Sequence, residues 1–169
     1  MLKLINDLRP FFENCYVRIS VRQYARMMKI TPPTASSLLK LYDKEGLLLS
    51  ARDRNYMMFY ANKDSPMFVG LSGLYWQSRL SELVEFLEDK LTNPTVVLFG
   101  SLSKAEAKPD SDIDLAIFAA KRAINFSQFE KKLKRKIQIF WYNSLKDVPS
   151  KELESSIING HILAGRLML

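Results

Sequence analysis

The sequence has little of what builds a disulfide or a zinc site: it contains one cysteine, Cys15, and one histidine, His161. A lone cysteine cannot form an internal disulfide, which fits a reducing cytoplasm. Without a group of His and Cys residues, the chain has no zinc-binding pattern. We expect a structural role for His161, which follows a predicted helix end at Gly160.

Long hydrophobic runs are lacking too. No stretch approaches the roughly 18 apolar residues of a membrane-spanning helix, so we expect no membrane partner. The N-terminus carries Asp7, Arg9 and Glu13 where a signal peptide needs an apolar core, so we expect no export signal and a cytoplasmic location. A chain of 169 residues, 47% hydrophobic and 25% charged, can form one domain or two small ones.

Negative charge is scarce in the first third of the chain. Residues 1–65 hold 11 Lys and Arg against 6 Asp and Glu, a net charge of +5, whereas residues 66–169 hold 14 against 12, a net charge of +2. This imbalance favours a polyanionic partner for the N-terminal third. A solvated charged surface is the alternative.

Two helices joined by a short connection are predicted in this third. Ser20 and Gln23 have the spacing of a capping box at a helix start. Thr31 can cap a second helix with Pro32 in its first position, and that helix ends at Gly46. So short a connection requires a sharp turn, which is the helix-turn-helix arrangement.

The second helix is amphipathic, and its apolar face carries Ala35, Leu38, Leu39 and Tyr42. The opposite face is small, polar and basic and could enter a DNA major groove with Ser37, Lys40 and Lys44. Two strand-like runs, LLLSA and YMMFYA, flank the turn RDRN and predict a hairpin. Its tip could reach phosphates with Arg52 and Arg54.

The order of helix, helix-turn-helix and hairpin resembles a winged helix-turn-helix domain over residues 1–65. The stretch TASSLLKLYDKEGLL looks like the recognition helix and wing entry of bacterial and archaeal regulators. The resemblance implies that double-stranded DNA is a partner. The alternative is a winged helix that contacts protein.

A long helix is predicted over residues 66–92, with an apolar stripe at helical spacing formed by Trp76, Leu80, Leu83, Leu87 and Leu91. We expect a connecting helix that packs on one or both domains; a homodimer seam is the alternative. Asn93 and Pro94 end this helix and mark a domain boundary.

Two aspartates point the same way in the C-terminal part. PTVVLF predicts a buried strand, followed by Gly100, Ser101 and a short helix, SLSKAEA; DIDLAIF predicts a second strand, on which Asp112 and Asp114 share a face. Adjacent carboxylates repel unless a cation such as Mg²⁺ lies between them. Gly100 allows close backbone approach, and Ser101 with the N–H groups of a helix start can hold a phosphate. The set therefore suits a nucleoside triphosphate with Mg²⁺, and a surface Asp pair that caps a loop is the alternative.

The stretch VVLFGSLSKAEAKPDSDIDLAIF looks like the signature of the minimal nucleotidyltransferases of the DNA polymerase β superfamily. The resemblance covers residues 93–169 and implies a small α/β domain with a mixed sheet, so the whole chain is expected to be α+β. It also implies that Gly100 and Ser101 contact the triphosphate. Asp112 and Asp114 would bind the metals that activate the attacking hydroxyl and stabilise the leaving pyrophosphate.

The sequence departs from this family in two places. Ala105 stands where members often have a second glycine, and Gln138, on the predicted strand KIQIFWY, stands where a third carboxylate is expected. Glutamine can offer a neutral oxygen to a metal but cannot act as a base. The preceding basic run KKLKRK, residues 131–136, is predicted to lie on a helix, where a solvated face is favoured over a nucleic-acid contact.

Three functions remain open. The first is an Mg²⁺-dependent enzyme that transfers a nucleotidyl group from an NTP, brought to nucleic acid or to a partner protein by its winged helix. The second is a DNA-binding regulator whose nucleotidyltransferase-like domain is weak or inactive, as Gln138 indicates. The third is an antitoxin, because relatives of this fold act beside HEPN-type toxins.

Overall fold

The computed structural model of the protein describes residues 2–167. The chain divides into two compact units. The N-terminal unit holds the chain up to Ser72 together with the segment Ala105–Pro109, and the C-terminal unit holds Gly73–Lys104 and the chain from Asp110 onward. The division falls within one long helix, α4 (Pro66–Lys90).

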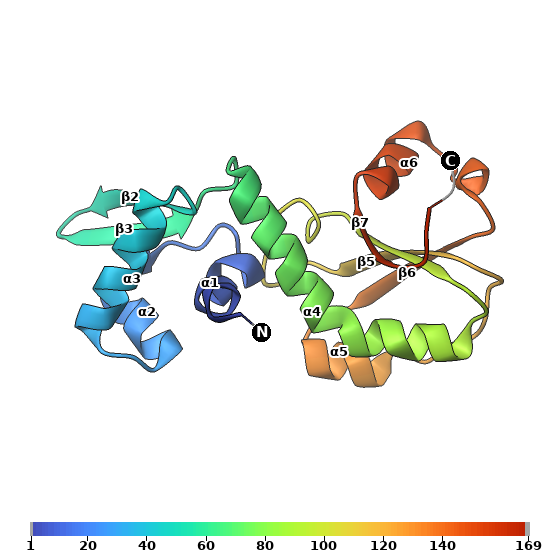
Figure 1. Cartoon of the computed structure of the whole chain (residues 1–169), viewed down its shortest axis with the longest axis horizontal. Helices are drawn as coiled ribbons and strands as arrows, with labels where there is room; N and C mark the ends of the chain where they lie inside the picture. The colour runs from blue at the N-terminus through green and yellow to red at the C-terminus, as the bar shows by residue number, and fades with distance from the viewer. Residues whose placement is uncertain (1, 168–169) are drawn as a thin grey trace. The chain divides into compact units, whose positions relative to one another are not determined.

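The N-terminal unit combines helices with a small antiparallel sheet of strand order β1-β3-β2 (Figure 1). Its elements are α1 (Lys3–Glu13), β1 (Ile19–Ser20), α2 (Val21–Met28), α3 (Pro32–Lys44), β2 (Leu48–Asp53), β3 (Tyr56–Ala61) and the first turns of α4. Both predicted helices and the predicted hairpin are therefore present. The hairpin turns through Arg54 and Asn55, because Asp53 pairs with Tyr56.

Local hydrogen bonds explain where α2 and α3 begin. Ser20 caps α2 with both bonds of a capping box: its hydroxyl accepts from the Gln23 N–H, and the Gln23 side chain accepts from the Ser20 N–H. The Thr31 hydroxyl accepts from the Thr34 N–H at the start of α3. Gly46 follows α3 with a φ of 71°, which glycine adopts without strain.

A buried aspartate joins the first three helices. Asp7 of α1 is 7% exposed and its Oδ2 accepts a 2.7 Å hydrogen bond from the Tyr42 hydroxyl of α3. The Tyr24 hydroxyl of α2 donates to the Asp7 carbonyl at 2.9 Å. Burial, and then the nearby Asp7 carboxyl, raise the pKa of both tyrosines, so both remain donors. This network fixes the mutual placement of the three helices.

The C-terminal unit is built on a four-stranded mixed sheet of order β6-β5-β4-β7. Its elements after α4 are β4 (Thr95–Phe99), β5 (Ile113–Phe118), α5 (Ser127–Leu133), β6 (Ile137–Tyr142), a 3₁₀ turn (Leu145–Asp147), α6 (Lys151–Ile158) and β7 (His161–Ala164). The β5–β6 pair is parallel, whereas β4 pairs with β5 and β7 antiparallel. The expected α+β fold with a mixed sheet is thus present.

Apolar side chains on both faces explain why β4 lies at the centre of this sheet. All five residues of β4 are buried. On one face, α6 and the 3₁₀ turn pack against the sheet through a cluster of Val97, Phe99, Ala116, Leu145 and Ile157. Figure 1 shows α4 and α5 on the other side of the sheet.

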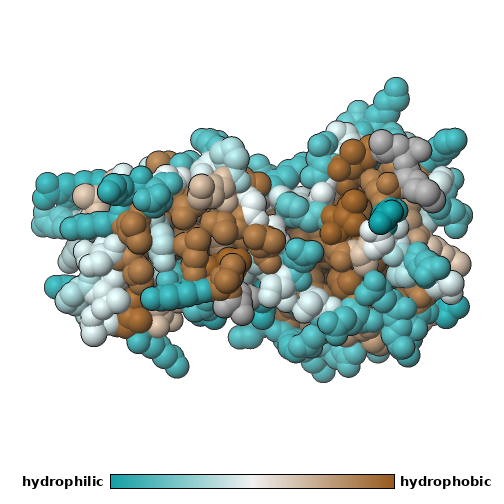
Figure 2. Space-filling view, in the orientation of Figure 1, coloured by the Kyte–Doolittle hydropathy of each residue, from teal (hydrophilic) through white to brown (hydrophobic). Residues whose placement is uncertain are grey.

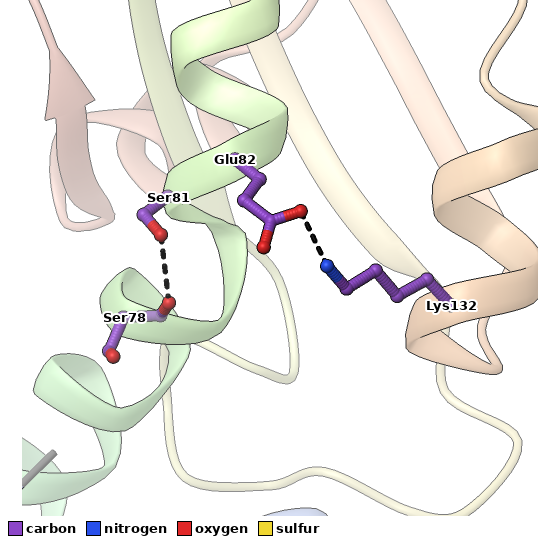
Figure 3. Close-up of polar contacts among 4 residues, drawn as sticks. All are labelled: Ser78, Ser81, Glu82 and Lys132. Atoms are coloured by element: carbon purple, nitrogen blue, oxygen red, sulfur yellow. Dashed lines mark hydrogen bonds and ion pairs between the residues drawn. The ribbon is translucent and has the colours of Figure 1, made fainter.

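Helices α4 and α5 contact each other through one aromatic pair and one ion pair. The rings of Phe86 and Phe129 have centroids 5.1 Å apart. Glu82 and Lys132 form the ion pair (Figure 3). The predicted apolar stripe of α4 is buried, from Trp76 to Leu91.

No helix in residues 2–167 is long and apolar enough to cross a membrane.

Two predictions of helix position are wrong. Residues 100–105 form turns instead of the helix expected after Ser101. This segment is held by packing, because Leu102 and Ala105 are fully buried, and Ala105 has a φ of 53° that a helix does not allow. Helix α5 ends at Leu133, and Lys134 has a φ of 57°, so the second half of the basic run lies beyond the helix.

Candidate functional site

Gly100 follows β4 directly and lies against a carboxylate of the next strand. Its φ is 74°, and a Cβ added there would overlap the Oδ2 of Asp114. The backbone angle therefore favours glycine, and a side chain at this position would displace the Asp114 carboxylate. The close approach brings the Asp114 carboxylate against the chain segment that leads into Ser101.

The two aspartates occupy the start of β5. Asp112 is exposed and immediately precedes the strand, while Asp114 is half-buried within it, opposite Phe99 of β4. Burial, and then the charge of Asp112, raise the pKa of the Asp114 carboxyl. Keeping both carboxyls ionised therefore costs free energy, and a bound cation would lower this cost.

Gln138 lies beside the aspartates on the neighbouring strand. The parallel register of β5 and β6 pairs Asp114 with Gln138, so the two side chains stand on the same face of the sheet. Within residues 2–167, no group of three or more His, Cys, Asp and Glu side chains could hold a metal ion. At the position where a third carboxylate was expected, the structure thus has the exposed side-chain amide of Gln138.

The donor set is compatible with a hard divalent cation. Asp112, Asp114 and Gln138 offer only oxygen ligands, two of them charged, which Mg²⁺ prefers. Gly100 leaves no side chain between the Asp114 carboxylate and the turn after β4. Two carboxylates are enough to attract a cation that keeps water and phosphate oxygens in its coordination shell.

Ser101 lies half-buried in the turn of residues 100–105 rather than at a helix start. Any phosphate contact therefore depends on the hydroxyl and on turn N–H groups, without help from a helix dipole. Ser103, which sequence reasoning missed, shapes this turn: its hydroxyl donates to the Gly100 carbonyl at 2.9 Å, and it is 5% exposed.

Arg135 is a second residue that sequence reasoning missed. Its Nη1 donates to the Ser111 carbonyl at 2.7 Å, one residue before Asp112. Its guanidinium also lies 5.1 Å from the ring centroid of Trp76 on α4. Arg135 thereby fixes the loop that leads into the aspartates. The sequence points to Arg135 only through the basic run of residues 131–136, which was predicted to lie on a helix.

The residues expected to contact DNA lie on the surface of the N-terminal unit. Lys40 and Lys44 are exposed on α3, and Arg52 and Arg54 are exposed on the hairpin. Ser37 is exposed as well, with its hydroxyl donating to the Pro33 carbonyl of its own helix at 3.1 Å.

A pocket of about 460 Å³ lies between α2 and the hairpin of the N-terminal unit. Its lining includes Arg22, Arg26 and Arg54 together with Asp53 and Tyr56. Sequence reasoning missed Arg22 and Arg26, because it considered only the polar face of α3. The pocket adds two cations to the expected basic surface.

The C-terminal unit also resembles a known family. Residues 80–159 match the family model of the nucleotidyltransferase domain. The match begins within α4 and ends just after α6, and it includes the turn after β4, both aspartates and Gln138. No curated protein matches the chain. The match confirms the resemblance inferred from the Gly-Ser and Asp-x-Asp motifs for this part of the chain.

Proposed function

We propose that the protein binds an Mg²⁺–NTP complex at Gly100, Ser101, Asp112 and Asp114 and transfers the nucleotidyl group to a hydroxyl acceptor. The observation that carries the proposal is the placement of the Asp114 carboxylate directly against Gly100, within the region that matches the nucleotidyltransferase domain. Mg²⁺ would supply charge neutralisation for the triphosphate and for the leaving pyrophosphate.

The chain's own residues have separate roles in this reaction. Gly100 and Ser101 hold the triphosphate, and the two aspartates hold the metal. The acceptor oxygen forms a bond to the α-phosphorus while the bond from that phosphorus to the bridging oxygen breaks, and pyrophosphate leaves. The acceptor proton passes to water, because the amide of Gln138 cannot take it.

Because position 138 carries an amide and no carboxylate, we expect nucleotidyl transfer to be slow. General-base assistance is worth about 10²–10⁴-fold, and a site without a base at this position forgoes it. The same observation favours a second candidate function, in which the C-terminal unit binds nucleotide without transferring it and the protein acts as a DNA-binding regulator or an antitoxin-type partner.

The N-terminal unit supports DNA binding in both candidates. Its helices α2 and α3, followed by the β2–β3 hairpin, have the order of a winged helix, and its exposed cations lie on α3, α2 and the hairpin turn. We include double-stranded DNA as its partner on the basis of this charge. A homodimer through α4 is less favoured, because the apolar stripe of that helix is buried within the chain.

Incubation with each of the four α-labelled NTPs, with Mg²⁺ or Mn²⁺ and with nucleic-acid, protein and small-molecule acceptors, tests the proposal. Label transferred to an acceptor, and lost in the Asp112→Asn/Asp114→Asn variant, supports the enzyme. Metal-dependent NTP binding without transfer supports the regulator. An absence of both would overturn both candidates.

A further inference from the structure

The outer strand β6 of the C-terminal sheet has a free edge. The sheet order is β6-β5-β4-β7, so β5 is the only strand beside β6 within residues 2–167. Strand β6 runs for six residues without a proline, a charged residue or a register shift. The other outer strand, β7, has four residues and pairs with β4 through a register shift. Of the two edges, β6 is therefore the longer and more regular one, which is the kind that accepts a further strand.

The backbone of β6 turns its even-numbered residues toward β5. The Ile113 N–H donates to the Lys136 carbonyl at 2.8 Å, and the Ala119 N–H donates to the Tyr142 carbonyl at 3.2 Å. In a parallel pair, alternate residues of a strand make such bonds with both of their backbone groups. The odd-numbered residues of β6 therefore direct their N–H and C=O groups to the free edge.

Three residues present their backbone groups outward in this way: Ile137, Ile139 and Trp141. Glu130 of α5 occupies one of these groups, because its Oε1 accepts from the Ile137 N–H at 3.0 Å. Both groups of Ile139 and of Trp141 and the C=O of Ile137 face an edge where no other strand of residues 2–167 lies. A row of edge N–H and C=O groups is a template for pairing with another polypeptide.

The side chains of β6 also suit a covered strand. All of them except Gln138 are half-buried, and five of the six are isoleucine or aromatic residues, which favour strands. A pocket of about 540 Å³ lies where the strand begins, and its lining includes Ile137 and Phe126. A second pocket, of about 390 Å³, lies where the strand ends, and its lining includes Trp141 and Lys121. The edge thus has a hollow at each end for the side chains of an added strand.

Cations flank this edge at both ends. Three exposed lysines at its start form no ion pair within residues 2–167 and line a further pocket of about 440 Å³: Lys131, Lys134 and Lys136. Glu130 lies in the same lining, but its carboxylate is engaged with a backbone N–H. Figure 2 shows a hydrophilic surface over α5, the helix that carries Lys131. At the other end of the strand, Lys121 is exposed as well.

Charge and backbone chemistry together select the occupant of this edge. A second copy would pair antiparallel about Ile139, the centre of the strand, and would bring the lysines at the start of one β6 beside Lys121 of the other. Asp147, in the same pocket lining as Lys121, already accepts from the Ser144 N–H at 2.8 Å, so like charges would meet at both ends. A nucleic acid would neutralise the lysines, but it has no row of N–H and C=O groups with which to extend the sheet. An acidic polypeptide supplies both.

We propose that the free edge of β6 binds an extended segment of a partner protein in which apolar residues are flanked by acidic ones. The segment pairs with the outward backbone groups of Ile139 and Trp141, and its carboxylates meet the lysines at the start of the strand. In such strand addition, main-chain hydrogen bonds give affinity and the side chains give specificity. The interaction requires neither nucleotide nor metal and so goes beyond the proposed transfer reaction.

Fluorescence anisotropy with a labelled peptide of sequence EEEVTVTVEEE tests the charge requirement on the full chain. The variant Lys131→Gln/Lys134→Gln/Lys136→Gln should bind it about tenfold more weakly, because each exposed ion pair contributes modestly. The control Lys3→Gln/Lys29→Gln/Lys151→Gln removes the same charge from exposed positions outside the edge and should bind as the wild type does. A loss no larger in the variant than in the control would overturn the proposal.

A second peptide tests the backbone requirement. N-methylation of its five central residues keeps every side chain and charge but removes the N–H donors, and it should weaken binding by about tenfold or more. Equal binding of the two peptides would overturn the proposal, because charge alone would then explain the affinity. The protein is unchanged in this comparison, so the result does not depend on how a variant folds.

Two further measurements separate the other occupants. Ile139→Pro removes an outward N–H, which an edge strand tolerates, and circular dichroism checks its fold. A wild type that self-associates in sedimentation velocity, and a proline variant that does not, would overturn the proposal in favour of a second copy. A larger loss of affinity for a 12-nucleotide single strand than for the peptide, in the triple lysine variant, would assign the edge to nucleic acid. Calorimetry of Mg²⁺–NTP on that variant should match the wild type, so failure of the proposed function and failure of this proposal are distinguishable.

Discussion

The two units of this protein use positive charge in different ways. In the N-terminal unit, Lys40, Lys44 and Arg54 are exposed on a helix and a hairpin, in a part of the chain where basic residues outnumber acidic ones. In the C-terminal unit, Lys136 and Arg135 lie at the start of β6, next to the two aspartates at the start of β5. A surface with an excess of positive charge can attract a polyanion, whereas charges of both signs on adjacent strands can also position a reacting group and a metal. The first arrangement predicts binding, and the second predicts chemistry.

The largest expected effect concerns the C-terminal unit alone. Gln138→Asp restores a carboxylate beside Asp114 and should raise nucleotidyl transfer by about 10²–10⁴-fold, because the side chain can then accept the acceptor proton. Transfer of α-labelled NTP by both proteins under the same Mg²⁺ concentration measures the change. Gln138→Glu, which is longer by one methylene, is the control for position. A fast wild type that is slowed by the substitution would show that another group is the base.

The next effect concerns the basic surface of the N-terminal unit. Changing Lys40, Lys44, Arg52 and Arg54 together to Ala should reduce the log–log salt slope for double-stranded DNA by about 3.6, at about 0.9 per phosphate. Gel shifts at several salt concentrations measure the slope. Metal-dependent NTP binding should remain as in the wild type. An unchanged slope would favour a winged helix that contacts protein.

A smaller effect concerns the buried network of the N-terminal unit. Tyr42→Phe removes the 2.7 Å hydrogen bond to Asp7 and leaves a buried carboxylate oxygen without that donor, which should cost about 1–3 kcal/mol of unfolding free energy. Tyr56→Phe, at a tyrosine that is 58% exposed, should change little. Urea unfolding followed by circular dichroism compares the two. Equal stability of both variants would show that Asp7 does not join the helices as described.

The smallest expected effect concerns the charge of Asp114 in the C-terminal unit. Because folding raises the pKa of Asp114, its ionised form destabilises the metal-free native state above that pKa, and this destabilisation disappears as the pH falls through it. Asp114→Asn should therefore raise the melting temperature slightly at pH 7 in chelator, by about 1–3 °C. The difference from wild type should narrow under acid conditions. A lower melting temperature for the variant at pH 7 contradicts this view of the site.

Local signals were sufficient to predict much of the N-terminal unit. The caps at Ser20 and Thr31 and the turn at Gly46 act within a few residues, so the sequence alone located α2 and α3. The pocket with Arg22 and Arg26 was missed because it depends on how α2 meets the hairpin. Helical periodicity describes one element at a time and does not report which elements meet.

The candidate site was predicted in its parts but not in its surroundings. Gly-Ser and Asp-x-Asp are short motifs, and the strand after them was identified well enough to select Gln138, which the β5–β6 register then pairs with Asp114. The helix expected after Ser101 is absent because burial of Leu102 and Ala105 outweighs local helix propensity. The contact of Arg135 with Ser111 spans 24 residues and has no local signal.

Calorimetric titration with Mg²⁺–NTP tests the central claim most directly, because that claim is that Asp112 and Asp114 hold the metal of a bound nucleotide. Wild type is compared with Asp112→Asn/Asp114→Asn, and circular dichroism confirms that both are folded. The account predicts saturable heat for the wild type that requires Mg²⁺, and none for the variant, while DNA binding by the N-terminal unit is unchanged. Equal nucleotide binding by both proteins would contradict the account.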